Sequence, residues 1–318
     1  MIYEFALTPG IFSDKILSGS HDIARDLVRF LEGLCENGLV GDLCDGGLRP
    51  VIGKAVSGLP AGQLRDEIRV CVEVLDKRQR FVSRPYVGPG WPDEDVEWLA
   101  EALACHSQEG FYAIVTLSDN LRARTCPSCT LPIGSVWQSS LWQDRGNSRR
   151  VERKAAVFQT VLRPVLRHAK SIMLIDPNIS PEKPRFFRSL QALVRTAYDR
   201  PDPTTLKVFE IHARSPAFAA STYAWFEGEV RSRIAHLVPA GCRLRLILWQ
   251  EMRPSLHNRF VLTNFCGISL DRGLDECDTG PDMDDWQLLS ENHRAAVWTD
   301  FRMRSAPPCT PVHECDIP

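Results

Sequence analysis

The chain of 318 residues has no apolar run of the roughly 18 residues that a membrane-spanning helix needs. It also lacks a strong charge of one sign, because 38 Lys and Arg stand against 40 Asp and Glu. We therefore expect no integral membrane association and no protein whose whole surface binds nucleic acid through positive charge. The first residues carry no basic segment followed by an apolar run, so we expect no signal peptide and a cytoplasmic protein.

No internal repeat and no low-complexity segment is visible, and the composition, 44% hydrophobic and 25% charged, is typical of a globular protein. The stretch from about 125 to 147 shows no hydrophobic period and ends in Gly and Asn. We therefore predict an N-terminal domain over 1–147, a C-terminal domain over 148–305 and an irregular, proline-rich tail over 306–318.

The N-terminal domain is predicted to be a small, helix-rich α/β unit. Two short apolar stretches, 2–7 and 111–116, favour buried strands. Apolar residues at helical spacing predict three amphipathic helices, with apolar faces over 27–34, 64–75 and 96–103.

The C-terminal domain is predicted to alternate strands and helices. Such an order implies right-handed crossovers and a largely parallel sheet with helices on both faces, hence an α/β fold. Ligands of such sheets bind at the carboxyl ends of the strands. The expected helices cover 151–166, 184–198 and 217–237, and the expected strands cover 171–175, 206–211, 243–249, 259–263 and 295–301.

The densest chemical signal is a histidine, an arginine and an asparagine near one predicted strand. His257 and Arg259 are two residues apart at the strand start, so both side chains are expected on one face. Imidazole can attack phosphorus or move a proton, and the guanidinium offers a planar fork to phosphate oxygens. Asn264 follows at the far end of the same strand. The alternative interpretation is that His257 only caps the strand through hydrogen bonds.

These residues resemble the signature of the phospholipase D superfamily, which is His-x-Lys followed after four residues by Asp. The closer resemblance, over about 150–305, is to the phospholipase D-like domain at the C-terminus of MIT-domain proteins and in bacterial relatives. The matching residues are His257-Asn258-Arg259, Asn264 and the run Asp271-Arg272-Gly273-Leu274-Asp275.

The resemblance implies binding of a phosphate or phosphodiester, with nucleic acid as the expected partner. Arg259 stands in place of the family lysine and Asn264 in place of the aspartate. A chain with one motif would need a homodimer to build the active site of the catalytic members. In a metal-independent phosphodiesterase or nuclease, His257 would form a phosphohistidine and Arg259 would stabilise the negative charge.

The MIT-type relatives imply an alternative, a non-catalytic adaptor that binds a protein partner or anionic lipid. Bacterial relatives of this type resemble accessory proteins of mobile-element or phage-defence loci.

Further residues are candidates for substrate binding. Asp176 and His212 are expected near strand ends, at the rim of the site. From 149 to 200 there are twelve Lys or Arg against four Asp or Glu. The basic residues at the expected helix start do not complement the helix dipole, so either an anionic partner or a solvated face explains them. They are Arg149, Arg150, Arg153 and Lys154.

No second Cys-x-x-Cys accompanies Cys126 and Cys129, whose spacing is that of a zinc ribbon. A structural zinc ion would need two more ligands, and free thiols are the alternative. The candidates for those ligands are Cys105, His106, Cys309, His313 and Cys315.

The stretch 113–119 is similar to the strand that ends in a metal-binding aspartate in PIN-type ribonucleases. In that interpretation Asp119 would hold Mg²⁺ together with Asp14 and Glu32. The alternative is that the N-terminal domain docks a partner or sets specificity.

Overall fold

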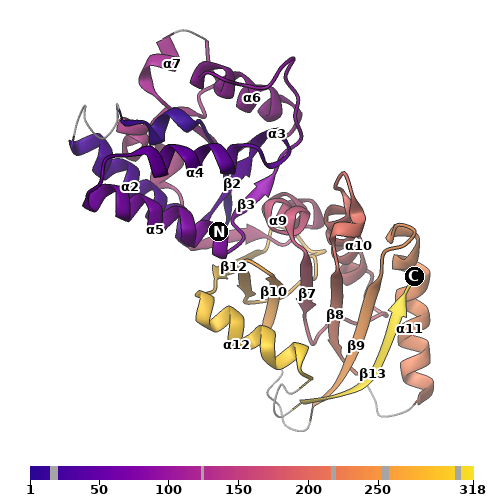
Figure 1. Ribbon diagram of the computed structural model, residues 1–318. Helices are drawn as coiled ribbons and strands as arrows, with labels where there is room; N and C mark the ends of the chain where they lie inside the picture. Colours follow the sequence, from indigo (N-terminus) through magenta and orange to yellow (C-terminus); the bar gives the residue numbers. More distant parts are fainter. Residues whose placement is uncertain (15–20, 123–124, 216–219, 252–257, 305–308) are drawn as a thin grey trace. The chain divides into compact units, whose positions relative to one another are not determined.

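The computed structural model describes residues 1–14, 21–122, 125–215, 220–251, 258–304 and 309–318. The chain forms two compact units, Ile2–Gly146 and Asn147–Pro318, the second together with Met1 (Figure 1). Each unit combines one sheet with surrounding helices, so the predicted α/β fold class is confirmed.

The N-terminal unit contains a five-stranded parallel sheet in the order β3-β2-β1-β4-β5. Chain order reverses at β1, whose neighbours are β2 and β4, so the carboxyl ends of β1 and β4 flank a topological switch point. The strands are β1 Tyr3–Leu7, β2 Gly38–Asp42, β3 Phe81–Ser83, β4 Ala113–Thr116 and β5 Thr130–Pro132.

Helices surround this sheet, and the three predicted amphipathic helices are confirmed as α2, α5 and α6. Leu27, Leu31 and Leu34 of α2 are buried, as their helical spacing predicts. The helical elements are η1 Pro9–Phe12, α2 His21–Asn37, α3 Leu43–Gly46, α4 Leu48–Gly58, α5 Gln63–Lys77, α6 Asp95–Gln108, α7 Ser118–Arg122, η2 Ile133–Gln138 and α8 Ser140–Gln143.

The C-terminal unit contains an eight-stranded mixed sheet in the order β13-β9-β8-β7-β10-β11-β12-β6. Only β7, β8 and β9 are mutually parallel, and all other neighbours pair antiparallel, so the prediction of a largely parallel sheet is wrong. The strands are β6 Ser148–Glu152, β7 Ser171–Ile175, β8 Val208–Arg214, β9 Leu244–Glu251, β10 Arg259–Thr263, β11 Gly267–Leu270, β12 Met283–Leu288 and β13 Cys309–Ile317.

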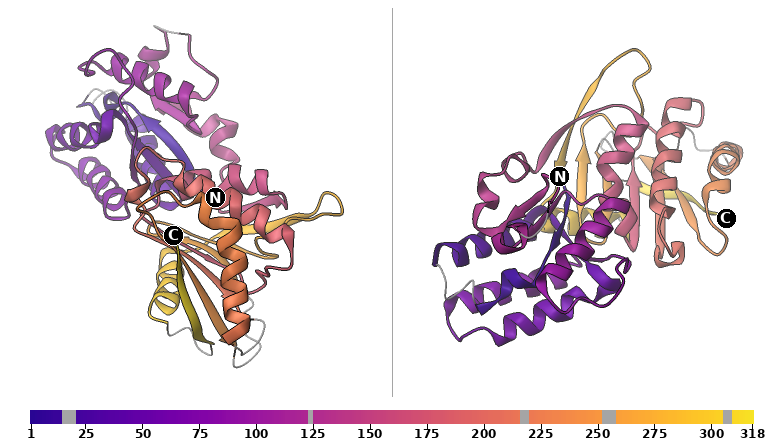
Figure 2. Two further views of the ribbon diagram at one scale, coloured as in Figure 1. Left: turned by 90° about the vertical axis from the view of Figure 1, so that its right-hand side faces the viewer. Right: turned by 90° about the horizontal axis from the view of Figure 1, so that it is seen from above.

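The helices of this unit lie on both faces of its sheet. Helix α10 packs between α9 and α11, whereas α12 lies on the opposite face (Figure 2). Phe301 of α12 packs against side chains of β7, β9 and β10. The helical elements are α9 Ala155–His168, α10 Pro184–Tyr198, η3 Pro203–Thr205, α11 Ala220–Ile234, η4 Ala235–Leu237 and α12 Glu291–Arg302.

The predicted strand over 295–301 is wrong, because this segment belongs to α12. The side chain of Ser290 accepts a hydrogen bond from the backbone N–H of His293, which begins the helix. Val297, Trp298 and Phe301, at helical spacing, form the face that packs on the sheet.

Three further boundaries differ from the sequence prediction. The segment 148–152 is edge strand β6, paired with β12, rather than the start of a helix. Strand β8 runs on to Arg214, beyond the predicted end at 211. The tail is not irregular, because β13 pairs with β9 and completes the sheet edge. Pro311 lies at a register shift between the two strands. Proline has no backbone N–H to donate, and such irregular positions tolerate the missing hydrogen bond.

Candidate functional site

The carboxyl edge of β7, β8 and β9 is the place where a sheet of this kind binds ligands. Strand β10 runs antiparallel to β7, and Phe260 pairs with Ile175, so β10 begins at that same edge. The register places Arg259 beside Asp176, which directly follows β7. The predicted catalytic histidine, His257, lies outside the described residues.

Asp176 does not lie at the rim of the site as predicted, because it is fully buried. Its Oδ1 accepts the backbone N–H of Asn178 at 2.8 Å, and its Oδ2 accepts the backbone N–H of Leu274 at 2.8 Å. Burial raises the pKa of Asp176 to about 6, although these hydrogen bonds and Arg259 oppose the shift. The carboxylate thus fixes the segment after β11 onto the end of β7.

Arg259 keeps one hydrogen-bond donor without an acceptor at this edge. Its Nη1 donates to the carbonyl of Asp271 at 2.7 Å, and its Nε lies 3.8 Å from Oδ1 of Asp176. Among the described residues, Nε has no hydrogen-bond acceptor although it is buried. The side chain is 21% exposed, so an oxyanion from solvent could reach the guanidinium.

Gly273 allows the chain to approach both of these side chains. Its φ of +106° lies in the left-handed region, which other residues rarely adopt. A Cβ atom at this position would lie 2.4 Å from Oδ2 of Asp176 and 2.9 Å from Cδ of Arg259. The glycine in the sequence run 271–275 is therefore a steric requirement of the site.

A second group of arginines surrounds Asp275 in the same segment. The buried Asp275 accepts from Nη2 of Arg153 at 2.5 Å and forms an ion pair with Nε of Arg185 at 3.0 Å. Arg153 also donates to Asp282 at 2.7 Å. One carboxylate thus holds two guanidinium groups. Arg153 is engaged in this network and does not belong to an exposed basic cluster.

The predicted basic cluster at a helix start is wrong in its placement. Arg149 and Arg150 are exposed on strand β6, where neighbouring side chains point to opposite faces. Strand β6 lies at the end of the sheet order, and charged residues on such an edge strand discourage pairing with other chains.

Asn264 does not belong to the same site as Arg259. Its Oδ1 accepts the backbone N–H of Lys170 at 2.8 Å and that of Ser171 at 3.3 Å, at the start of β7. The five-residue length of β10 separates it from Arg259 by roughly 16 Å, at about 3.3 Å per residue. A single phosphate cannot contact both side chains.

His212 is also not a rim residue, because β8 continues past it and its side chain is buried. Its Nδ1 accepts the indole N–H of Trp249 at 3.0 Å, and its Nε2 lies 3.2 Å from a carboxylate oxygen of Glu210. Indole is only a donor, so Nδ1 carries no proton and the imidazole is neutral with its proton on Nε2. Burial lowers the pKa of His212, in agreement with this tautomer.

The three carboxylates predicted for Mg²⁺ in the N-terminal unit do not come together. Asp119 is exposed on α7, and its Oδ1 lies 3.9 Å from Nη1 of Arg122. Asp14 and Glu32 are also exposed. Over the described part of the chain, none of these residues belongs to a group of three side chains that could share a metal ion.

A different carboxylate, Asp95, lies at the switch point of the N-terminal sheet. It accepts hydrogen bonds from the hydroxyl of Thr8 at 3.0 Å and from the amide of Asn120 at 2.6 Å. The hydroxyls of Thr8 and Thr116, at the ends of β1 and β4, are 2.9 Å apart. This network was not predicted from the sequence, because an acidic residue in the first turn of a helix is usual.

The cysteine pair does not form the predicted zinc site within the described residues. Sγ of Cys129 lies 3.6 Å from Nε2 of His106, but Cys126 does not complete a group of three ligands with them. Cys105 contacts the carbonyl of Pro85 instead. Where the chain is described, the only group of three that could hold a metal ion is Glu227, His313 and Cys315.

Comparison with known proteins adds little to this description. No family model and no curated protein matches the chain. One solved structure, that of the archaeal chromatin protein TrmBL2 with a novel mode of DNA binding, aligns at a TM-score of 0.26 and 11% identity. The alignment covers 50% of this chain and 52% of TrmBL2, and at this TM-score it assigns no fold. Within the described ranges, no helix has the length and apolarity to cross a membrane.

Proposed function

We propose that the C-terminal unit binds a phosphate group of a phosphodiester at the carboxyl edge of β7, through Arg259. The observation that carries the proposal is the guanidinium of Arg259, whose Nη1 is held by the carbonyl of Asp271 while its Nε has no acceptor among the described residues. The resemblance of this segment to phospholipase D-like domains supports the same ligand class.

The surroundings of Arg259 suit an oxyanion. The carbonyl of Asp271 fixes one end of the guanidinium, so little side-chain entropy remains to be lost on binding. Asp176 offsets only part of the positive charge, because its Oδ1 lies 3.8 Å from Nε of Arg259, beyond hydrogen-bonding distance. A phosphate oxygen that reaches the exposed part of this guanidinium would therefore form a charge-assisted hydrogen bond with it.

Nucleic acid is the ligand class that we favour. The exposed Arg149 and Arg150 on β6 offer further positive charges of this unit to the phosphates of a nucleic-acid strand. We propose binding as the activity, because the guanidinium of Arg259 supplies positive charge and hydrogen-bond donors to a phosphate, whereas the candidate nucleophile His257 lies outside the described residues.

A fluorescence-anisotropy titration of a labelled single-stranded oligonucleotide tests the proposal. Replacing Arg259→Gln should weaken binding about tenfold or more, since a charge-assisted contact to phosphate contributes roughly 1.5–3 kcal/mol. The matched control is Arg243→Gln, which removes an exposed arginine just before β9, at the opposite edge of the sheet. Equal affinities of the two variants would contradict the proposal.

Other ligand classes give distinct outcomes. Binding to vesicles of anionic lipid but not to oligonucleotide would show that the ligand is a membrane surface and not nucleic acid. Cleavage of the oligonucleotide in the presence of EDTA, lost in His257→Ala, would add metal-independent turnover. A partner protein that binds only at the carboxyl edge of β7, around Arg259, would favour the alternative of a non-catalytic adaptor.

We also propose that the protein acts in the cytoplasm. Ten cysteines of the described chain are free thiols, and six of them are buried. Free thiols in this number favour a reducing compartment.

A further inference from the structure

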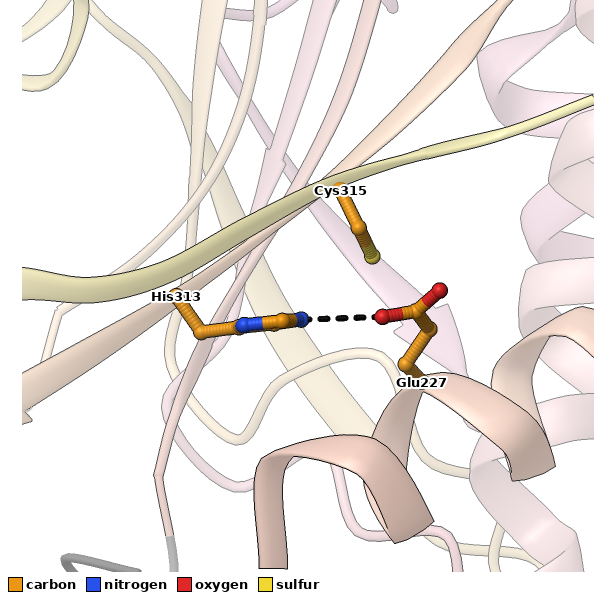
Figure 3. Close-up of side chains that lie close together, drawn as sticks. All are labelled: Glu227, His313 and Cys315. Carbon is orange, nitrogen blue, oxygen red and sulfur yellow. Dashed lines mark hydrogen bonds and ion pairs between the residues drawn. The ribbon is translucent and has the colours of Figure 1, made fainter. Parts of the chain in front are cut away.

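We propose that Glu227, His313 and Cys315 form a zinc-binding site that ties the last strand of the C-terminal sheet to helix α11. The three side chains point toward one another (Figure 3). Their ligand atoms all lie within 4.8 Å of one another, and each side chain is partly exposed, so an ion can enter from solvent. The site is separate from the edge around Arg259.

The backbone delivers these ligands from two elements. His313 and Cys315 are two residues apart on β13, so both face the same side of the sheet. Their pairing with Leu248 and Leu246 of β9 is regular, since the register shift lies before His313. Helix α11 packs against β13 and contributes Glu227.

The separation of the ligand atoms of His313 and Glu227 is close to that in a tetrahedral zinc site. Zinc bonds of about 2.0–2.3 Å place neighbouring ligand atoms about 3.3–3.6 Å apart. Nε2 of His313 lies 3.0 Å from Oε2 of Glu227, so these atoms need to separate by only about 0.3 Å, within the ±0.2 Å tolerated in each metal–ligand bond. The fourth position would hold water, as in sites with three protein ligands.

Neighbouring residues orient two of the ligands. Nη2 of Arg231 donates to Oε1 of Glu227 at 2.8 Å and to the carbonyl of Asp316 at 2.9 Å, which leaves Oε2 for the ion. The ring of Tyr223 stacks on the imidazole of His313, with 5.7 Å between centroids. Contacts of this kind, made to the ligand side chains by neighbouring residues, orient metal ligands.

The donor set selects the ion. A thiolate, an imidazole and a carboxylate together favour Zn²⁺ and disfavour Mg²⁺ and Ca²⁺, which prefer oxygen ligands only. Without metal, burial raises the pKa of the Cys315 thiol to about 12, with the charge of Glu227 adding to the shift. The hydrogen bond from Arg231 lowers the pKa of Glu227, so this ligand is ionised.

Binding requires two proton movements. The Cys315 thiol gives its proton to solvent, and the thiolate sulfur bonds to the ion. The imidazole proton of His313, which now lies between Nε2 and Glu227, moves to Nδ1, so that the Nε2 lone pair bonds to the ion. Zinc affinity should therefore rise with pH.

Titration of the full-length, EDTA-treated protein with Co²⁺ alone tests this site in a reducing buffer. The expected result is a thiolate-to-cobalt charge-transfer band in the near ultraviolet, with visible bands of tetrahedral intensity, both removed by Zn²⁺. Cys315→Ser should abolish the charge-transfer band. Glu227→Gln should weaken Co²⁺ binding by at least about 100-fold. Loss of a residue that only orients a metal ligand lowers metal affinity about 10–100-fold, and loss of a ligand itself should lower it further.

The matched control is Cys129→Ser, which removes a cysteine that lies beside a histidine outside the proposed site. It should leave the spectrum and the affinity unchanged. No charge-transfer band in the wild-type protein, or a band that survives in Cys315→Ser, would overturn the proposal. If Cys315→Ser does not fold by circular dichroism, Glu227→Gln decides, since the amide can still bond to His313, and unchanged Co²⁺ affinity in this variant would equally overturn it.

Discussion

Nε of Arg259 lies 3.8 Å from Oδ1 of the buried Asp176, and both side chains bind the segment that follows β11. Asp176 accepts the N–H of Leu274, and Arg259 donates to the carbonyl of Asp271. The carboxylate thus serves to position this segment and the arginine. Of the two side chains, the arginine carries the positive charge that a phosphate ligand requires.

Replacement of Gly273→Ala should destabilise the C-terminal unit by about 1–3 kcal/mol. The left-handed φ disfavours alanine, and the added Cβ would collide with Asp176. Urea unfolding measures the loss. Gly241→Ala is the matched control, because that glycine also has a positive φ but nothing within 4 Å of its would-be Cβ. An equal loss in both variants would show that backbone strain alone acts and that the close approach to Asp176 has no effect.

Replacement of Asp275→Asn should destabilise the unit by about 3 kcal/mol, because it leaves the partly buried Arg153 and Arg185 short of a carboxylate. Asp199→Asn, which breaks an exposed ion pair with Arg163, should cost less than about 1 kcal/mol. Chemical denaturation compares the two. A cost below 1 kcal/mol for Asp275→Asn would mean that the network does not hold the segment.

The free energy of unfolding should fall as the pH drops below about 6.5, in part through His212. Burial lowers the pKa of His212 in the folded state, so the unfolded chain takes up the proton first. The stabilisation is present above the unfolded pKa and is lost as pH falls toward the folded pKa. His212→Gln should show a flatter profile between pH 7 and pH 5 than the wild type. Identical slopes would argue against a neutral, buried imidazole.

Oligonucleotide affinity should increase as pH falls through about 6. Asp176 has its pKa raised to that value by burial, so at lower pH it becomes neutral and no longer repels phosphate beside Arg259. The repulsion between this carboxylate and a phosphate bound at Arg259 amounts to about 0.5–2 kcal/mol. Arg259→Gln should show a smaller change in affinity between pH 7.5 and pH 5.5 than the wild type, because it lacks the positive charge that Asp176 partly neutralises. Binding curves at both pH values for both proteins check this, with circular dichroism confirming the fold.

The elements with a clear hydrophobic period were predictable from the sequence. Strand β7, strand β10 and the helices α2, α5 and α10 lie where the pattern indicates. Helix α12 was predicted as a strand because its Ala-Ala-Val-Trp run has no obvious polar face, and the capping role of Ser290 was missed. Strand β13 was missed because its residues gain regular structure only by pairing with β9.

The candidate site was predictable only in part. Adjacent strands placed Arg259 and Asp176 at one edge, which follows from topology. Their burial depends on the segment 271–275 folding over them, and that contact between residues about 100 positions apart has no local signal. His212 was assigned to the rim because the end of β8 was set three residues too early.

The slope of log Kd against log salt concentration tests most directly whether Arg259 contacts a phosphate. For a single-stranded oligonucleotide, removal of one phosphate contact should reduce the slope by about 0.7. We predict that reduction for Arg259→Gln and none for Arg243→Gln. A wild-type slope in Arg259→Gln, with any loss of affinity independent of salt, would contradict the proposed site.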